Sequence, residues 1–116
     1  MSKNVGGPSG ATILAGDLNS DANDPSGASG PGFGILLNGG FTDIWSALHP
    51  DDAGLTWPNF AEDQAIENAP NQRIDLILIR GNGVEAKSEQ RIGTTPINGI
   101  WASDHAGVVA TMKLLP

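Results

Sequence analysis

Side chains that could do chemistry occur at three places where apolar, strand-like runs begin or end. Asp17 and Asn19 follow the run in "ILAGDLN", Asp75 lies within "RIDLILI", and Asp104 and His105 precede the run in "SDHAGVV". Carboxylates and imidazoles transfer protons in enzyme active sites, and carboxylate oxygens bind hard divalent cations. These residue types at strand ends predict a hydrolytic site.

Asp75 is the most informative of these residues because its neighbours in the sequence are apolar and burial is expected. A buried carboxylate costs several kcal/mol unless it is paired or hydrogen-bonded. A contact with His105 would meet this need, fix the tautomer of the imidazole and leave its second nitrogen to exchange a proton with water. Two alternatives remain open: Asp75 could pair with Arg73 or Arg91, and His105 could be a core histidine.

The acids after the first apolar run predict a cation site. Asp17, Asp104 and Asp21 are candidate ligands for a divalent metal such as Mg²⁺, Ca²⁺ or Mn²⁺, and the amide of Asn19 could donate to a developing negative oxygen. The alternative is an Asx-rich turn, since Asp and Asn readily hydrogen-bond to nearby backbone. An EF-hand loop is a poor match, because Gly is absent at its sixth position and Glu at its twelfth.

The charge balance restricts the substrate. The net charge is -7, and only six Lys and Arg residues are present. Proteins bind nucleic acids largely by neutralising phosphates with Lys and Arg, so long nucleic acid is a poor candidate and a small molecule is expected. Trp57 and Trp101 are candidate substrate-binding residues, with packing in the core or at a dimer interface as the alternative.

The chain length of 116 residues predicts a single domain over residues 1–116, with Met1–Gly10 as a flexible leader. Cys is absent, which excludes disulfides and thiolate metal sites. No apolar run approaches the roughly 20 residues that span a bilayer, and no signal-peptide core is visible. We therefore expect a soluble, cytoplasmic protein that does not bind membranes.

The elements that must position these residues alternate between strands and helices. A long Gly, Ser, Pro and Asp loop over residues 17–31 has no apolar periodicity, as functional loops often do not. The patterns predict helices over 32–38 and 41–48 and strands over 11–15, 55–60, 72–80, 84–92 and 107–115. The expected fold is α/β, with one mixed, mostly antiparallel sheet and helices on one face.

Such a sheet would leave its second face bare, although a domain needs at least two packed layers. The runs "DLILI" and "GVVATM" carry apolar residues at both parities, so both of their faces require cover. A second copy of the chain could supply that cover, and a C2 dimer needs only one self-complementary patch. We expect a homodimer.

The motifs "AGDLNSD", "QRIDLILIR" and "WASDHAGVVATMKL", in this order, resemble the GDxN, RIDxI and SDHxxV motifs of the endonuclease/exonuclease/phosphatase superfamily, which includes the DNase I-like nucleases. The resemblance covers Thr12–Leu115. It implies that Asp17 handles the water or the leaving group and that Asn19 contacts the transition-state oxygens. It also implies that Asp75 orients His105, which acts as a general base or electrostatic stabiliser, and that Asp104 lies at the metal site.

The resemblance covers only the C-terminal half of the superfamily's four-layer α/β sandwich. An Asn and a metal-binding Glu of the family precede its GDxN motif, and no counterpart precedes Thr12 here. The implied function is metal-dependent hydrolysis of a small phosphodiester or phosphomonoester. A Ca²⁺- or Mg²⁺-dependent carboxylic ester or lactone hydrolase is the alternative, and a catalytically silent fragment or binding module is a second.

Overall fold

The computed structural model describes residues 10–59 and 71–116, so most of the predicted leader and Phe60 lie outside the described residues. Among the described residues, no helix is long and apolar enough to cross a membrane. In chain order the elements are β1 (Thr12–Asp17), α1 (Gly32–Asn38), β2 (Thr42–Asp43), α2 (Ile44–Leu48), β3 (Asp75–Arg80), β4 (Val84–Ile92) and β5 (Gly107–Leu114).

The described strands form two antiparallel sheets, so the prediction of a single mixed sheet was wrong. One sheet has the order β1-β3-β2, and the other is the hairpin β4-β5. The chain leaves the first sheet at the Gly81–Gly83 turn, where Gly81 has a φ of 94°. A Cβ at Gly83 would lie 2.8 Å from the carbonyl oxygen of Gly10, so the turn needs glycine to pass this close to the start of β1.

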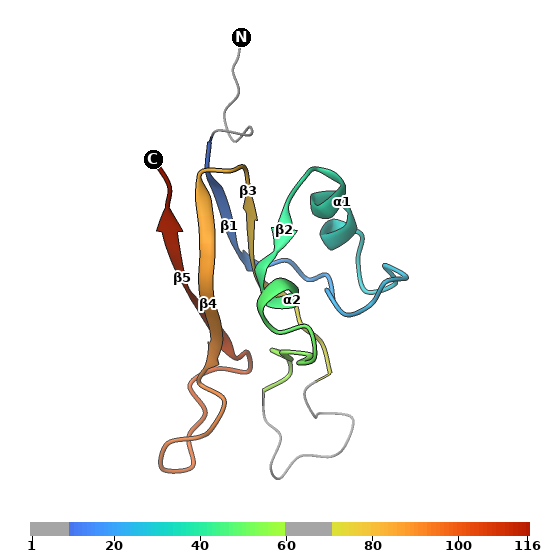
Figure 1. The fold of residues 1–116 in the computed structure, drawn as a ribbon. Helices are drawn as coiled ribbons and strands as arrows, with labels where there is room; N and C mark the ends of the chain where they lie inside the picture. Colours follow the sequence, from blue (N-terminus) through green and yellow to red (C-terminus); the bar gives the residue numbers. More distant parts are fainter. Residues whose placement is uncertain (1–9, 60–70) are drawn as a thin grey trace.

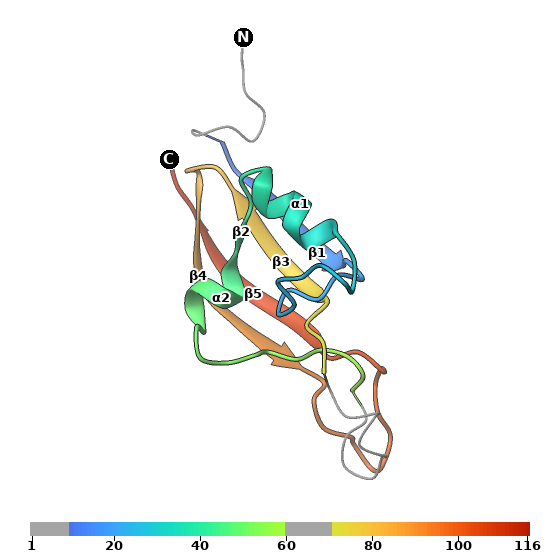
Figure 2. The same ribbon diagram turned by 90° about the vertical axis from the view of Figure 1, so that its right-hand side faces the viewer.

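The two sheets and α1 are stacked as layers. Figure 1 and Figure 2 show the β1-β3-β2 sheet between α1 on one side and the β4-β5 hairpin on the other. Successive side chains of a strand point to opposite faces. Ile77 of β3 therefore faces β5, where it lines a groove with Val108, whereas the fully buried Leu76 and Leu78 face the layer of α1.

Two predicted elements differ most from the observed ones, and the predicted strand 72–80 begins only at Asp75 as β3. The predicted helix 41–48 begins only at Ile44, because Thr42 and Asp43 pair with β3 as strand β2. The predicted strand 55–60 is reduced in the described residues to a single bridge between Trp57 and Gln72. Pairing with β3 decides the first conformation, and a contact with the segment that leads into β3 decides the second. Local periodicity does not contain that information.

The layer between the sheets is open along the edges of β1 and β5. An apolar groove of about 410 Å³ runs there, and Ile13 on its wall keeps 50% of its surface exposed. No charged residue is among those that line the groove, which are Ile13, Ala15, Ile77, Val108, Val109, Ala110 and Met112. The second sheet thus covers the inner face of the first only in part.

Candidate active site

The register between β1 and β3 brings two carboxylates together. Asp17 and Asp75 are paired across the two antiparallel strands at one end of the sheet, so their side chains lie on the same face. Like charges directly opposite one another destabilise a sheet. The pair therefore needs a cationic group or a cation nearby.

His105 supplies such a group from the segment just before β5. Its Nδ1 lies 2.8 Å from Oδ2 of Asp75, and its Nε2 lies 4.0 Å from Oδ2 of Asp17. The hydrogen bond to Asp75 raises the pKa of His105 above its ordinary value; burial opposes this shift, and the charges of Asp75, Asp17 and Asp104 add to it. Asp75 and His105 therefore form a hydrogen-bonded pair in which the carboxylate favours the protonated imidazole. This pair is called the Asp75–His105 dyad.

Asp17 and Asp75 line a pocket of about 280 Å³ whose walls come from β1, β3 and the start of β5. The side chain of Asp17 is 41% exposed and that of Asp75 only 16%. Gly16 and Gly107 lie among the lining residues, so little side-chain bulk narrows the mouth. A small solute in the pocket can reach the carboxylate of Asp17, and the imidazole of His105, whose side chain is 27% exposed, lies 4.0 Å from that carboxylate.

Three further residues that the sequence predicts for the site are Asn19, Trp57 and Trp101, and they lie in three different segments of the chain. Asn19 is next to Asp17, adopts a φ of 48° and donates its backbone N–H to Oδ1 of Asp17 at 2.9 Å. The ring of Trp57 lies beside the imidazole of His105, with 6.3 Å between the two centroids. Trp101 is half-buried in the segment between β4 and β5. Their roles in binding stay predictions.

Asp104 and Asp21 are not brought to the Asp75–His105 dyad as ligands. Asp104 is exposed, and its backbone carbonyl accepts the N–H of Asn59 at 2.9 Å. Oδ1 of Asp21 accepts the backbone N–H groups of Asn23 and Arg73, each at 3.0 Å. The Asx-turn interpretation thus holds for Asp21, which ties the loop to the segment before β3.

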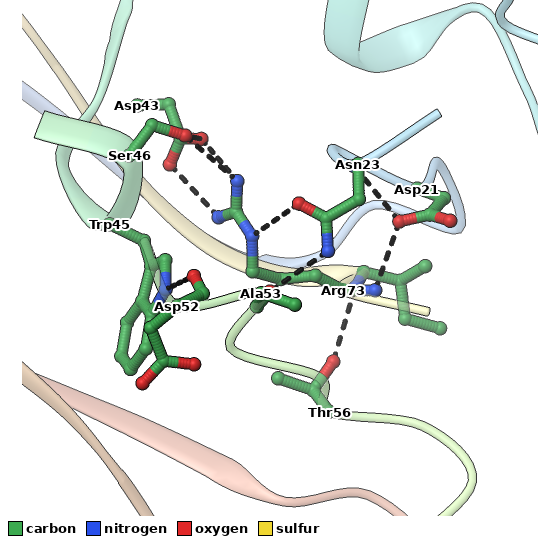
Figure 3. Close-up of polar contacts among 10 residues, drawn as sticks. Asp21, Asn23, Asp43, Trp45, Ser46, Asp52, Ala53, Thr56 and Arg73 are labelled. Atoms are coloured by element: carbon green, nitrogen blue, oxygen red, sulfur yellow. Dashed lines mark hydrogen bonds and ion pairs between the residues drawn. The ribbon is translucent and has the colours of Figure 1, made fainter. Parts of the chain in front are cut away.

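Arg73 organises the buried polar network behind the loop, as Figure 3 shows. Its guanidinium pairs with both carboxylate oxygens of Asp43, and its Nε donates to Oδ1 of Asn23 at 3.5 Å. The residue is only 2% exposed. Arg73 is therefore not the partner of Asp75. Nor is Arg91, which donates to the carbonyl of Leu55 at 3.1 Å.

Sequence reasoning missed two buried polar residues next to the site. Thr56 is 1% exposed and Asn59 is 6% exposed, and both lie in the segment after α2, which hydrogen-bonds to the chain before β3 and to the chain before β5. The only signal was their place in "LTWPNF", beside the tryptophan that was proposed as a pocket residue. Nothing in that pattern indicates their hydrogen-bond partners, which are distant in sequence.

The donor atoms at the site fit a divalent cation. In the part of the chain that the structure describes, Asp17, Asp75 and His105 form the group of acids and histidines whose potential ligand atoms all lie within 4.8 Å of one another. Carboxylate oxygens suit Mg²⁺, Ca²⁺ and Mn²⁺, and imidazole suits several transition metals. Since Asp75 and His105 already bind each other, Asp17 is the side chain best able to hold a cation.

Comparison with protein families places the chain in a known family. The family model described as "Endonuclease/Exonuclease/phosphatase family" matches residues 4–105 of this 116-residue chain. The matched range includes Asp17 and Asp75 and ends at His105. A search of curated proteins found no match. The family match covers far more than half of the sequence and contains all three side chains of the acid–histidine group, so this chain belongs to the endonuclease/exonuclease/phosphatase family.

Proposed function

We propose that this protein is a divalent-metal-dependent hydrolase of small phosphodiesters or phosphomonoesters. Membership of a family of nucleases and phosphatases supports hydrolysis of phosphoesters. The observation that carries the proposal is the Asp75–His105 contact of 2.8 Å beside the exposed carboxylate of Asp17, in a pocket open to solvent.

In this proposal His105 accepts the proton of the attacking water at Nε2. Asp75 accepts the hydrogen bond from Nδ1–H, which keeps Nε2 free of a proton in the neutral imidazole. When Nε2 takes up the proton, the imidazolium lies between the carboxylates of Asp75 and Asp17, and both stabilise its charge. The proton later passes to the leaving group, as general acid–base catalysis requires.

Asp17 is the principal ligand that would hold the cation, with Asp75 as the nearest second carboxylate. A bound divalent metal would supply Lewis-acid polarisation of a phosphoryl oxygen. Asp17 accepts the backbone N–H of Asn19 and so holds the turn that carries this residue, and the side-chain amide of Asn19 is our candidate donor to a negative oxygen of the substrate.

A small substrate agrees with the charge and the size of the site. The pocket of about 280 Å³ lies at the lower end of the range for small-molecule sites. The chain has only six Lys and Arg residues, so few positive charges are present to neutralise the phosphates of a long nucleic acid. The indole of Trp57 next to His105 offers an apolar surface for the leaving group.

Hydrolysis of bis-p-nitrophenyl phosphate tests this proposal. The purified protein is assayed alone, with EDTA, and with Mg²⁺, Mn²⁺ or Ca²⁺ restored after chelation. We expect activity that EDTA abolishes, that one of the cations restores, and that His105→Ala lowers at least about 100-fold. The exposed acid Asp51 provides the control Asp51→Asn, which should leave the rate unchanged. Activity that survives both EDTA and His105→Ala would exclude the proposal.

We also propose that the protein forms a homodimer through the open edges of β1 and β5. The support is the uncharged apolar groove between these strands, which shares Ala15, Ile77 and Val108 with the lining of the active-site pocket. An apolar patch of this kind marks an interaction surface more often than a chance exposure. A copy bound there would border the site of its partner.

A further inference from the structure

Thr56 connects the two segments that carry the Asp75–His105 dyad. Its hydroxyl oxygen accepts the backbone N–H groups of Ile74 at 3.1 Å and Asp75 at 3.3 Å. Its backbone carbonyl accepts the N–H of Ala106, the residue after His105, at 2.8 Å. One buried residue thus binds the backbone at Asp75 and the backbone next to His105.

Asn59 adds a second connection on the His105 side. Its side-chain amide donates to the carbonyl oxygens of Gly93 at 2.7 Å and Ser103 at 3.4 Å. Its backbone N–H donates to the carbonyl of Asp104 at 2.9 Å. These bonds hold both ends of the segment between β4 and β5, which carries His105 at its end.

The need for such connections follows from the topology. Asp75 begins β3 in the first sheet, whereas His105 precedes β5 in the second, and no ladder of hydrogen bonds joins these sheets in the described residues. Without further hydrogen bonds, only the dyad and the non-directional apolar packing of β3 on β5 would keep the two segments in place. Misplacement of a reacting group by about 1 Å can cost about 100-fold in rate.

We propose that Thr56 and Asn59 are positioning residues that hold Asp75 and His105 in their productive geometry. This inference rests on the proposed hydrolytic function for its kinetic consequences, but not for its structural ones. Neither residue contacts the reacting atoms. Thr56 acts through the backbone at Asp75 and Ala106, and Asn59 acts through the carbonyls of the segment that leads to His105.

The decisive comparison is between Thr56→Val and Thr56→Ser. Valine keeps the shape of the side chain but removes the acceptor of two buried N–H groups, whereas serine keeps the hydroxyl. We expect Thr56→Val to lower kcat about 10- to 100-fold with KM within about 2-fold of wild type, and Thr56→Ser to retain kcat within about 3-fold. Thr111→Val, at an exposed threonine of β5, is the matched control and should behave as wild type.

An NMR signal separates this inference from the catalytic proposal. The Nδ1 proton of His105 should give a downfield resonance in wild type and in Thr56→Ser, since the carboxylate of Asp75 protects it, and the signal should be lost or broadened in Thr56→Val. If wild type shows no hydrolysis, the proposed function fails, but this signal still decides whether Thr56 positions the Asp75–His105 dyad. An unchanged signal in Thr56→Val would overturn the inference.

Asn59→Asp provides a second, independent variant in case Thr56→Val does not fold. The aspartate keeps the shape but replaces the donor amide by oxygens that repel the carbonyls of Gly93 and Ser103. The same loss of kcat and of the His105 resonance is expected, with the exposed Asn82→Asp as its control. Wild-type kcat in folded Asn59→Asp would remove Asn59 from the inference. The same conclusion would follow if the loss of activity were no larger than the unfolded fraction of the protein, measured by circular dichroism.

Discussion

Asp17 and Asp75 face each other across the β1–β3 ladder, and the imidazole of His105 lies between them, 2.8 Å from Asp75 and 4.0 Å from Asp17. Strand register alone places two negative charges side by side, and the cost of that arrangement is offset by a group that can become positive. A site that favours the imidazolium is suited to accept a proton and to release it again. The pKa of His105 is raised chiefly by its hydrogen bond to Asp75, as expected for an imidazole that the site favours in its protonated form.

Asp75→Asn should lower the hydrolysis rate of bis-p-nitrophenyl phosphate by about 10²- to 10⁴-fold, because the amide can no longer stabilise the imidazolium and can favour the wrong tautomer. The hydrogen bond that His105 donates to Asp75 is the largest cause of the raised pKa of His105, so its loss should lower that pKa. Activity that requires neutral His105 would then rise with pH at a lower pH than in wild type. A pH–rate profile measures this shift. If activity instead began to rise at a higher pH than in wild type, the assigned role of Asp75 would be contradicted.

Asp17→Asn should weaken metal binding more than it disturbs the fold, since the Asp17 side chain is 41% exposed. Its hydrogen bond is the local one from the N–H of Asn19, which an Asn oxygen can also accept, and its contact with His105 is a longer one of 4.0 Å. Titration with Mn²⁺ followed by calorimetry should show at least about 10-fold weaker binding, with the melting temperature of the metal-free protein little changed. Asp51→Asn again serves as the exposed control. Equal affinity in wild type and Asp17→Asn would place the cation elsewhere.

Glu89 should make the fold less stable as the pH rises. This glutamate on β4 is 3% exposed, and its Oε1 has no hydrogen-bond partner among the described residues. Burial, with a further contribution from the charge of Asp43, raises the pKa of Glu89 to about 7, although Arg73 and His49 act in the opposite direction. Between pH 4.5, its ordinary pKa, and pH 7 the unfolded chain loses this proton while the folded chain keeps it, so the free energy of unfolding falls across that window.

The size of this fall should be on the order of 2 kcal/mol, and Glu89→Gln should remove it, leaving the separate contribution of His105, whose raised pKa also makes the fold less stable as the pH rises. Urea unfolding at pH 5 and pH 8 measures the difference in both proteins. Glu85→Gln, at an exposed position of the same strand, is the control and should keep the pH dependence of wild type. A Glu89→Gln protein that is as pH-dependent as wild type would show that another group causes the effect.

Arg73→Ala should destabilise the protein by about 3–5 kcal/mol, the usual cost of removing one partner from a buried ion pair. The carboxylate of Asp43 would remain 6% exposed without its cation, and the loop anchor through Asn23 would also be lost. Chemical denaturation monitored by tryptophan fluorescence measures the change. Arg80→Ala, whose guanidinium lies over the ring of Phe41 and donates to the carbonyl of Gly39, should cost less because Arg80 pairs with no buried carboxylate within the described part of the chain. The reverse order would show that the Arg73 network contributes little.

Ile13→Lys should prevent dimer formation, because it places a charge in the uncharged groove beside β1 and β5. Size-exclusion chromatography with light scattering should report a dimer for wild type and a monomer for the variant. Ile35→Lys introduces the same charge at an exposed position of α1, away from the groove, and should leave the dimer intact. A monomeric wild type at micromolar concentration would reject a homodimer through this face.

The sequence by itself determined the residue types of the site and several of its elements. The helix over 32–38 and the strand over 84–92 coincide with the predictions, because apolar periodicity and flanking glycines are local signals. The need of Asp75 for a partner followed from its apolar neighbours, and His105 was the available histidine at a strand end. The family motifs agree with the later family match.

Only the tertiary structure decided how these parts meet. Whether β4 joins β3 or pairs with β5 depends on long-range hydrogen bonding, and the same pairing energies turned residues 42–43 into a strand. The pairing of Asp17 with Asp75, the capture of Arg73 by Asp43 and the links made by Thr56 all join residues far apart in the chain. Burial and charge pairing are properties of neighbours in space, and a pattern along one sequence records which groups need partners but not which partners they find.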